Sequence, residues 1–314
     1  MRILSLIILT VIGCLTGTAT STSVILRNAQ IEVRVDLQHG LILGFSQPGK
    51  LNLLWVNPHP VSSPDRNAGW INYGGDKLWW GPMIDWQKAQ GRRLPPDEAL
   101  DGAWQVVSLS ATRLVMRSGV SPWVGIYAER EITLSPDSPE VIFQNRFVRT
   151  QENPQRLQLW TVCQLPPPEW CLLNSQPRMG EPPYINRRPT LNPRPYTSVI
   201  PQTGDVRYRY NAAGPNLIGT SGSWVAAVYA DHIVCHEVSP GPDGDYATDV
   251  SVQLFSNRDF VELETLSANA TPKVGEFMTN TVRWHVLLRP PELSEEELAV
   301  WIQQQMTAKA AARK

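Results

Sequence analysis

The sequence contains little charge and few cysteines. Charged residues make up 18% of its 314 residues, less than the usual quarter, and the formal net charge is −1. No extended surface of one sign is therefore expected, and nucleic acid is a poor candidate for a partner. The chain has four cysteines, with no CxxC pair and no zinc-type spacing, so we predict no metal site. None of the motifs requires a cofactor.

The only long apolar run lies at the N-terminus. Residues 3–11 are almost wholly apolar, but they are too few for a stable membrane-spanning helix, and the pattern predicts a targeting segment over residues 1–23. Two cleavage readings stay open. Gly17-Thr18-Ala19 suits an ordinary signal peptidase, whereas Val11-Ile12-Gly13-Cys14 resembles a bacterial lipobox in which Cys14 is lipidated. Both predict export to the periplasm, cell envelope or exterior, and in the second reading a lipid on Cys14 is the only membrane contact.

Export makes disulfides relevant for the remaining cysteines. Cys163 and Cys171 lie eight positions apart across a run of three prolines, which stiffens the segment between them. One reading is a disulfide between these two residues, with Cys235 left over. The other is three buried free thiols, which we favour because unpaired cysteines are commonly buried.

Alternating polarity dominates the chain from Val24 onward. Ile31, Val33 and Val35 alternate with charged residues, which indicates a strand with one solvent-exposed face. Similar patterns predict about fourteen strands, at residues 31–35, 40–45, 51–56, 104–109, 113–118, 127–134, 140–148, 157–165, 206–210, 224–229, 233–238, 249–256, 260–266 and 281–288. The pattern predicts an all-β fold, with one domain over residues 24–290 built from two packed, mostly antiparallel sheets.

Two segments interrupt this pattern. Residues 62–103 appear as a long irregular loop, and loops of this length are usually functional or disordered. Residues 166–203 contain ten prolines, so we expect neither a helix nor a central strand there. One helix is predicted within residues 291–314, where Ser294 and Glu297 form a capping box.

The long loop carries the most informative motif of the chain. Tyr73-Gly74-Gly75-Asp76-Lys77-Leu78-Trp79-Trp80-Gly81-Pro82 lies between Trp70 and Trp86, giving four tryptophans within 17 positions. Aromatic planes beside a few polar groups suit a sugar, which is apolar on one face and rich in hydroxyls at its edges. The alternative is that these tryptophans fill the end of a β-sandwich core.

Three segments together resemble a known family. Residues 72–79 resemble the GG-(D/H)-(K/R)-LW signature of the DUF4380 family of bacterial proteins, which belongs to the galactose-mutarotase-like superfamily. Residues 260–267 resemble the late strand of that superfamily, with residues 275–276 and 281–284 as its return, and residues 157–164 resemble its apolar-W-T-x-x-Q strand. The resemblance implies a β-supersandwich with a carbohydrate-binding groove across one concave sheet.

The resemblance also implies a catalytic arrangement that this chain matches only in part. Sugar mutarotases of the superfamily use a late-strand carboxylate as the base and a middle-strand histidine as the acid. Glu264 matches the base, but the middle strand reads Trp160-Thr161-Val162-Cys163-Gln164 and has no histidine. Glu262 shares a strand face with Glu264 and would supply an acid if both line the groove.

From these observations we predict an exported carbohydrate-binding protein with no metal and no cofactor. Its groove would be bordered by Trp79, Trp80, Trp86 and Trp160, and its polar contacts would be Asp76, Lys77, Gln164, Glu262 and Glu264. Asp76 or Lys77 is a second source of the missing acid. Two alternatives stay open, namely an aldose 1-epimerase-like enzyme with Glu264 as general base, and an envelope scaffold whose tryptophans are core residues.

Overall fold

A computed structural model describes residues 23–62, 69–95, 97–177, 179–187, 194–212, 214–239, 245–246 and 250–313. Apart from Ser23, which begins the first strand, the predicted targeting segment lies outside the described residues, and so does Cys14. No helix in the described ranges is both long enough and apolar enough to cross a membrane.

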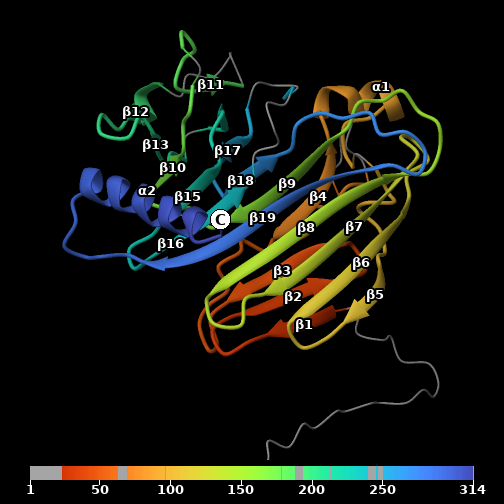
Figure 1. Cartoon of the computed structure of the whole chain (residues 1–314), viewed down its shortest axis with the longest axis horizontal. Coiled ribbons are helices and arrows are strands. Elements are labelled where there is room, and N and C mark those ends of the chain that lie inside the picture. Colours follow the sequence, from red (N-terminus) through yellow and green to blue (C-terminus); the bar gives the residue numbers. More distant parts are fainter. Residues whose placement is uncertain are drawn as a thin grey trace, which may run out of the picture.

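Two large antiparallel sheets face each other, as Figure 1 shows. The first has nine strands in the order β1 (Ser23–Arg27), β2 (Glu32–Asp36), β3 (Leu41–Ser46), β4 (Asp76–Gly81), β9 (Gln158–Leu165), β18 (Val261–Leu266), β17 (Val252–Ser256), β14 (Asn216–Thr220) and β11 (Ile185–Asn186). The second has ten, in the order β12 (Thr197–Val199), β13 (Val206–Arg209), β10 (Trp170–Leu173), β15 (Trp224–Val228), β16 (His232–Val238), β19 (Phe277–Leu288), β8 (Glu140–Arg149), β7 (Ile126–Leu134), β6 (Arg113–Val120) and β5 (Gln105–Leu109). The predicted all-β architecture of two packed sheets is confirmed.

The main core lies between the sheets and follows the period-two pattern. In β7, Ala128, Arg130 and Ile132 are buried, whereas Glu129 and Glu131 on the other face are partly exposed. The inward residues of the second sheet meet those of the first in one large apolar cluster. Alternation in the sequence was a reliable guide where one face of the strand meets solvent.

The sequence predictions failed where strands are buried on both faces. The predicted loop over residues 62–103 contains β4, a central strand between β3 and β9 whose six residues are all buried. The proline-rich segment 166–203 contains β10, which pairs with β13 and β15 on its two sides. Full burial removes the polar alternation that identifies a strand. The strand predicted at residues 51–56 was also wrong, since only Val56 pairs there, in an isolated bridge to Gly74.

The C-terminal helix α2 (Glu295–Ala311) packs on the outer face of the ten-stranded sheet. The predicted capping box is confirmed, because Ser294 Oγ accepts from the backbone N–H of Glu297 while the Glu297 carboxylate accepts from the backbone N–H of Ser294. Leu298, Ile302 and Met306 face a second apolar cluster that includes Trp170 and Trp224.

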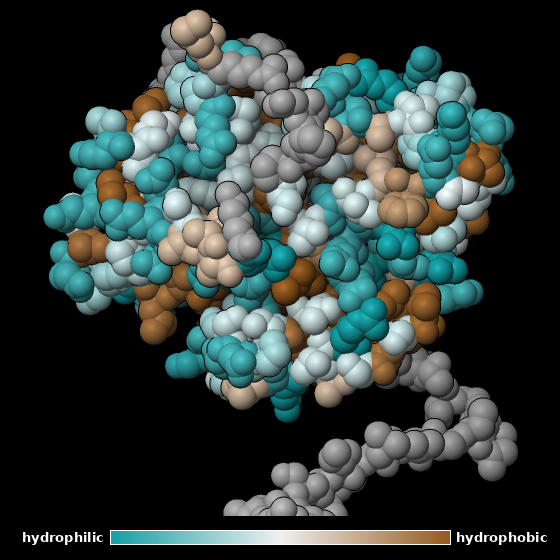
Figure 2. All heavy atoms as spheres, viewed as in Figure 1, coloured by the Kyte–Doolittle hydropathy of each residue, from teal (hydrophilic) through white to brown (hydrophobic). Residues whose placement is uncertain are grey.

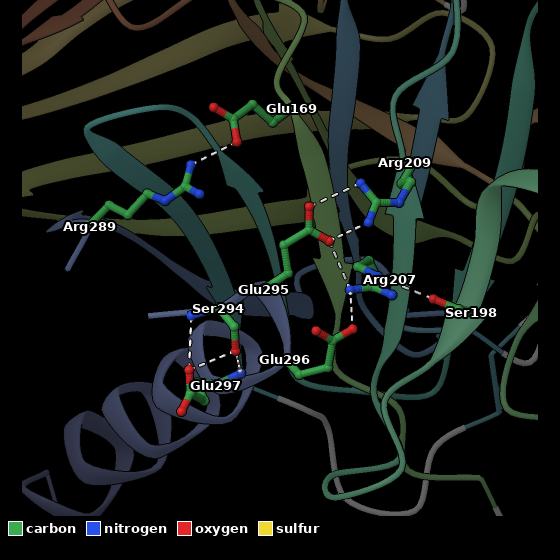
Figure 3. A network of polar contacts seen from close by, with 9 residues as sticks. All are labelled: Glu169, Ser198, Arg207, Arg209, Arg289, Ser294, Glu295, Glu296 and Glu297. Carbon is green, nitrogen blue, oxygen red and sulfur yellow. Dashed lines mark hydrogen bonds and ion pairs between the residues drawn. The ribbon is translucent and has the colours of Figure 1, made fainter. Parts of the chain in front are cut away.

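Ion pairs hold the start of α2 against the sheet. Figure 3 shows Arg207 and Arg209 of β13 reaching Glu295, with Arg207 also donating to Glu296 at 2.8 Å. These carboxylates lie in the first turn of α2, where negative charge is favoured by the helix dipole.

The structure decides between the two readings of the cysteines. Cys163, Cys171 and Cys235 are buried free thiols, so the favoured reading is confirmed and the disulfide between Cys163 and Cys171 is not formed.

On the face in Figure 2, hydrophobic residues appear as separate groups among hydrophilic ones.

Candidate functional site

The alternation of β4 divides the tryptophan-rich motif between two faces of the nine-stranded sheet. Successive side chains of a strand point to opposite faces. Lys77 and Trp79 lie on the outer face, opposite Val162 and Trp160 of β9. Asp76, Leu78 and Trp80 therefore point to the opposite side, toward the core between the sheets. The motif thus contributes buried side chains to both faces of the sheet, where the sequence analysis expected a single binding groove.

Asp76 is a core residue and does not contact a groove. It is fully buried and forms an ion pair with Arg130 of β7, which belongs to the other sheet. Burial raises the pKa of Asp76 to about 6, although the nearby Arg130 and Lys77 act in the opposite direction. The prediction that Asp76 is a sugar contact is therefore corrected.

Trp80 and Trp86 are also interior residues. Neither has any exposed surface, and Trp86 donates its indole N–H to the backbone carbonyl of Trp80 at 2.8 Å. Trp86 begins the short helix α1 (Trp86–Gln90), which follows the 3₁₀ turn η1 (Met83–Asp85) at one end of β4 (Figure 1). For these two rings, the core alternative stated above is correct, and it holds for most of the surface of Trp79 and Trp160 too, which are 6% and 8% exposed and belong to the same apolar cluster.

Trp79, Trp86 and Trp160 form an aromatic cluster on the outer face of the sheet. Their ring centroids lie 5.3 Å apart for Trp79 and Trp86, 5.5 Å for Trp86 and Trp160, and 5.8 Å for Trp79 and Trp160. The two outer members donate to different carboxylates. Trp79 Nε1 donates to Asp101 Oδ1 at 3.0 Å, and Trp160 Nε1 donates to Glu264 Oε2 at 2.7 Å. The cluster therefore has an oriented carboxylate on each side.

A cavity of about 480 Å³ opens beside Glu264 and Trp160, and we refer to it as the Glu264 cavity. It lies between η1, α1 and the strands β9, β17 and β18. Its polar lining comprises Gln87, Arg93, Gln158, Arg187, Gln253 and Glu264, and its apolar lining comprises Pro82, Met83, Ile84, Trp160, Leu217 and Leu266. A small number of polar groups beside apolar surface is typical of a small-molecule site.

Strand register positions Glu264 in this cavity. Glu264 lies opposite Val162 of β9 and Gln253 of β17, so its side chain shares a face with both neighbours. Glu264 is 2% exposed, and its carboxylate accepts from Trp160 Nε1 at 2.7 Å and from Gln253 Nε2 at 3.3 Å. Two of the predicted site residues, Trp160 and Glu264, are thus brought together although 104 positions separate them in sequence.

Gln164 and Glu262 form a separate pair on the same face. They lie opposite each other in the ladder between β9 and β18, and Gln164 Nε2 donates to Glu262 Oε1 at 2.7 Å. Neither lines the Glu264 cavity. Glu262 and Glu264 share a face as predicted, but i and i+2 positions on a strand are about 6.6 Å apart along its axis. Each carboxylate therefore accepts a hydrogen bond from a glutamine amide, Glu262 from Gln164 and Glu264 from Gln253, and the two carboxylates do not share a proton in a direct pair.

No histidine lines the Glu264 cavity among the described residues. His236 is buried in the core and burial lowers its pKa to about 3, while His285 is buried on the outer face of the ten-stranded sheet beside Glu140 and Glu237. Arg93 and Arg187 contribute hydrogen-bond donors to the cavity. The described lining therefore offers one carboxylate and several hydrogen-bonding groups.

Lys77 lines a second cavity, of about 290 Å³, which we call the Lys77 cavity. Asp101 lines it too, together with Trp70, Tyr73 and His39. Asp101 was not identified from sequence, because an Asp-Gly pair in a long irregular segment is typical of a turn. The structure thus places Lys77 and Glu264 in different cavities, on opposite sides of the aromatic cluster.

Within the described ranges, no group of three or more His, Cys, Asp and Glu side chains is arranged to hold a metal ion.

The solved structures that resemble this one share a fold and little sequence. A galactose mutarotase-like protein from Lactobacillus casei ATCC 334 matches with a TM-score of 0.57 and 10% identity, over 84% of this chain and 100% of that one. A galactose mutarotase related enzyme from Lactobacillus acidophilus matches with a TM-score of 0.54 and 8% identity, over 84% and 97%. A galactose 1-epimerase from Lactobacillus acidophilus NCFM matches with a TM-score of 0.51 and 10% identity, over 85% and 94%.

These matches establish the fold of the chain, but neither its family nor its function. No protein-family model and no curated protein matches the sequence. Membership of the DUF4380 family therefore stays a prediction, whereas the fold is that of galactose mutarotase-like and aldose 1-epimerase proteins, which the sequence motifs had implied.

Proposed function

We propose that this protein binds a carbohydrate in the Glu264 cavity. The observation that supports this most strongly is the oriented Glu264 carboxylate, held by Trp160 and Gln253 at the wall of a 480 Å³ cavity. The volume lies in the range of ordinary small-molecule pockets. The resemblance to mutarotase-like folds over most of the chain is consistent with a sugar ligand.

The lining suits the two kinds of surface that a sugar presents. Trp160, Pro82 and Leu266 offer apolar contacts to the C–H face of a pyranose ring. Glu264 accepts hydrogen bonds from hydroxyl groups, while Gln158 and Gln253 can donate and accept. Arg93 and Arg187 add positive charge to the lining, so the test panel should include acidic as well as neutral sugars.

The proposal also includes export. It rests on the apolar run of residues 3–11 and the small residues that follow. Mass spectrometry of the protein purified from its native envelope would distinguish a lipidated N-terminal Cys14 from cleavage after Ala19.

The decisive experiment is a glycan-array screen of the mature protein, followed by isothermal titration of every hit. Glu264→Gln should weaken binding at least tenfold, because a hydrogen bond to a charged group contributes about 1.5–3 kcal/mol. Glu131→Gln is the matched control, since Glu131 pairs with Arg113 on the outer face of the other sheet. Silence across neutral and acidic glycans, or equal affinity for Glu264→Gln and wild type, would overturn the proposal; silence would favour the envelope scaffold.

A second candidate function is sugar epimerisation with Glu264 as the base. The buried carboxylate at the cavity wall favours it, and the lack of a histidine among the described lining residues counts against it. Anomer exchange followed by NMR decides between binding and turnover. Acceleration that is lost in Glu264→Gln would establish the enzyme, whereas binding without acceleration would exclude it.

A further inference from the structure

The Lys77 cavity contains a buried amine with few polar partners. Lys77 is 4% exposed, and within the described ranges its Nζ has one hydrogen bond, to Asn72 Oδ1 at 3.5 Å. Nζ lies 5.1 Å from the ring centre of Trp79 and 5.8 Å from that of Trp70. Both distances are within cation–π range, so the two rings partly compensate the charge of the amine, while the three donors of an ammonium group find few acceptors among the described residues. The group is therefore poorly solvated for a charged amine.

Burial favours the neutral, nucleophilic form of the amine, whereas the contacts with Trp70 and Trp79 favour the ammonium. Burial lowers the pKa of Lys77, and the effect exceeds the opposing influence of Glu262 and Asp101 on the same side of the sheet and of Asp76 and Cys163 on its inner face. Lysines in apolar pockets act as nucleophiles toward carbonyl groups for this reason. A neutral amine beside an accessible cavity can attack a ligand that enters it.

Asp101 supplies a proton carrier in the same cavity. Its carboxylate is oriented by the indole N–H of Trp79, which lies 3.0 Å from Oδ1 and 3.2 Å from Oδ2. Burial raises the pKa of Asp101 to about 7, so the acid and its conjugate base are both populated near neutral pH. Because Lys77 is held by Asn72 and Asp101 by Trp79, the two groups are anchored separately around the cavity.

We propose that Lys77 forms an imine with a small aldehyde or ketone bound in the Lys77 cavity, with Asp101 carrying the proton. The Nζ lone pair attacks the carbonyl carbon, one amine proton reaches the carbonyl oxygen, and a carbinolamine forms. The carboxyl group of Asp101 then protonates the hydroxyl group, which leaves as water as the C=N bond forms. The carboxylate takes the proton back when water hydrolyses the imine, so the cycle needs no oxidant or reductant.

The cavity restricts the ligand class. A volume of about 290 Å³, walled by Trp70 and Tyr73, suits a carbonyl compound of a few carbon atoms that carries hydroxyl groups. The inference does not depend on carbohydrate binding in the Glu264 cavity, because the two cavities have no lining residue in common.

Reductive trapping tests the proposal on the wild-type protein. Glycolaldehyde and sodium cyanoborohydride are added at several pH values, and labelling of each lysine is quantified by peptide mass spectrometry. Lys50, Lys88 and Lys273 are exposed and serve as internal controls. At pH 7 we expect Lys77 to be labelled several-fold faster than these three, since its lowered pKa leaves a larger fraction of the amine neutral. The labelling rate of Lys77 should also reach its plateau at a lower pH than the rates of the three exposed lysines.

Two variants test the roles of the residues. Asp101→Asn should slow labelling of Lys77 without changing the rate at Lys50, because asparagine still accepts from Trp79 but cannot supply the proton. Lys77→Met should remove the fast label, with circular dichroism confirming that the variant is folded. The proposal is overturned if wild-type Lys77 reacts no faster than the exposed lysines, or if Asp101→Asn leaves the Lys77 rate and its pH profile unchanged.

Discussion

Asp76 of β4 and Arg130 of β7 form an ion pair that joins the two sheets, and their side chains are 1% and 0% exposed. Arg130 also lies over the ring of Phe143, with its guanidinium carbon 4.6 Å from the ring centre. Charges removed from water must be paired, because an isolated buried charge is highly unfavourable. The aspartate of the GGDKLW motif is thus part of the core of the fold, and the lysine beside it is the residue that reaches a cavity.

Breaking this ion pair should strongly destabilise the protein. Asp76→Ala leaves Arg130 buried without its partner, and we expect a loss of about 3–5 kcal/mol in the free energy of unfolding. Urea denaturation followed by tryptophan fluorescence measures it. Glu131→Ala removes the exposed pair with Arg113 and should cost less than about 1 kcal/mol. Equal losses in the two variants would contradict a special role for the buried pair.

The stability of the protein should fall as the pH rises through the titration of Asp101. The pKa of Asp101 is raised from 3.8 to about 7 in the folded state, so folding favours the protonated form. Its stabilising contribution is complete below pH 4 and is lost between about pH 4 and pH 7. The free energy of unfolding of wild type relative to Asp101→Asn should decrease over this window. An exposed carboxylate variant, Glu292→Gln, should show no such trend, and a flat difference for Asp101→Asn would refute the assignment.

Removing the indole N–H of Trp160 should weaken carbohydrate binding while keeping the aromatic surface. Trp160→Phe deletes the donor that lies 2.7 Å from Glu264, so the carboxylate loses its orientation. We expect the dissociation constant of a glycan hit to rise by about tenfold or more, as measured by titration calorimetry. Trp79→Phe is the matched control, because Trp79 donates to Asp101 on the other side of the cluster. Equal effects of both variants would indicate general loosening of the aromatic cluster.

The C-terminal helix should be an integral part of the fold. Ile302 is fully buried among Trp170, Trp224 and their neighbours, so Ile302→Ala should cost about 2–5 kcal/mol in the free energy of unfolding. Gln304→Ala changes an exposed position of the same helix and should alter stability by less than about 0.5 kcal/mol. A comparable result for both variants would mean that α2 packs loosely on the sheet.

Local sequence patterns determined much of the architecture. The alternation in residues 127–134 and 140–148 marked β7 and β8 because one face of each strand meets the core and the other is more polar. The capping box at Ser294 and Glu297 marked the start of α2, because it satisfies backbone groups within four consecutive residues. Both signals arise from contacts or environments that repeat over short distances, so a single sequence is sufficient to read them.

Only the tertiary structure decided how the predicted site residues are divided. Whether Asp76 meets a sugar or an arginine depends on Arg130, which comes from the opposite sheet, and Glu264 meets Trp160 through strand pairing across 104 positions. The burial of β4 on both faces also removed the alternation that would have shown Lys77 and Trp80 pointing in opposite directions. Periodicity describes a strand relative to its own two faces, whereas the neighbours on each face are set by the packing of distant segments.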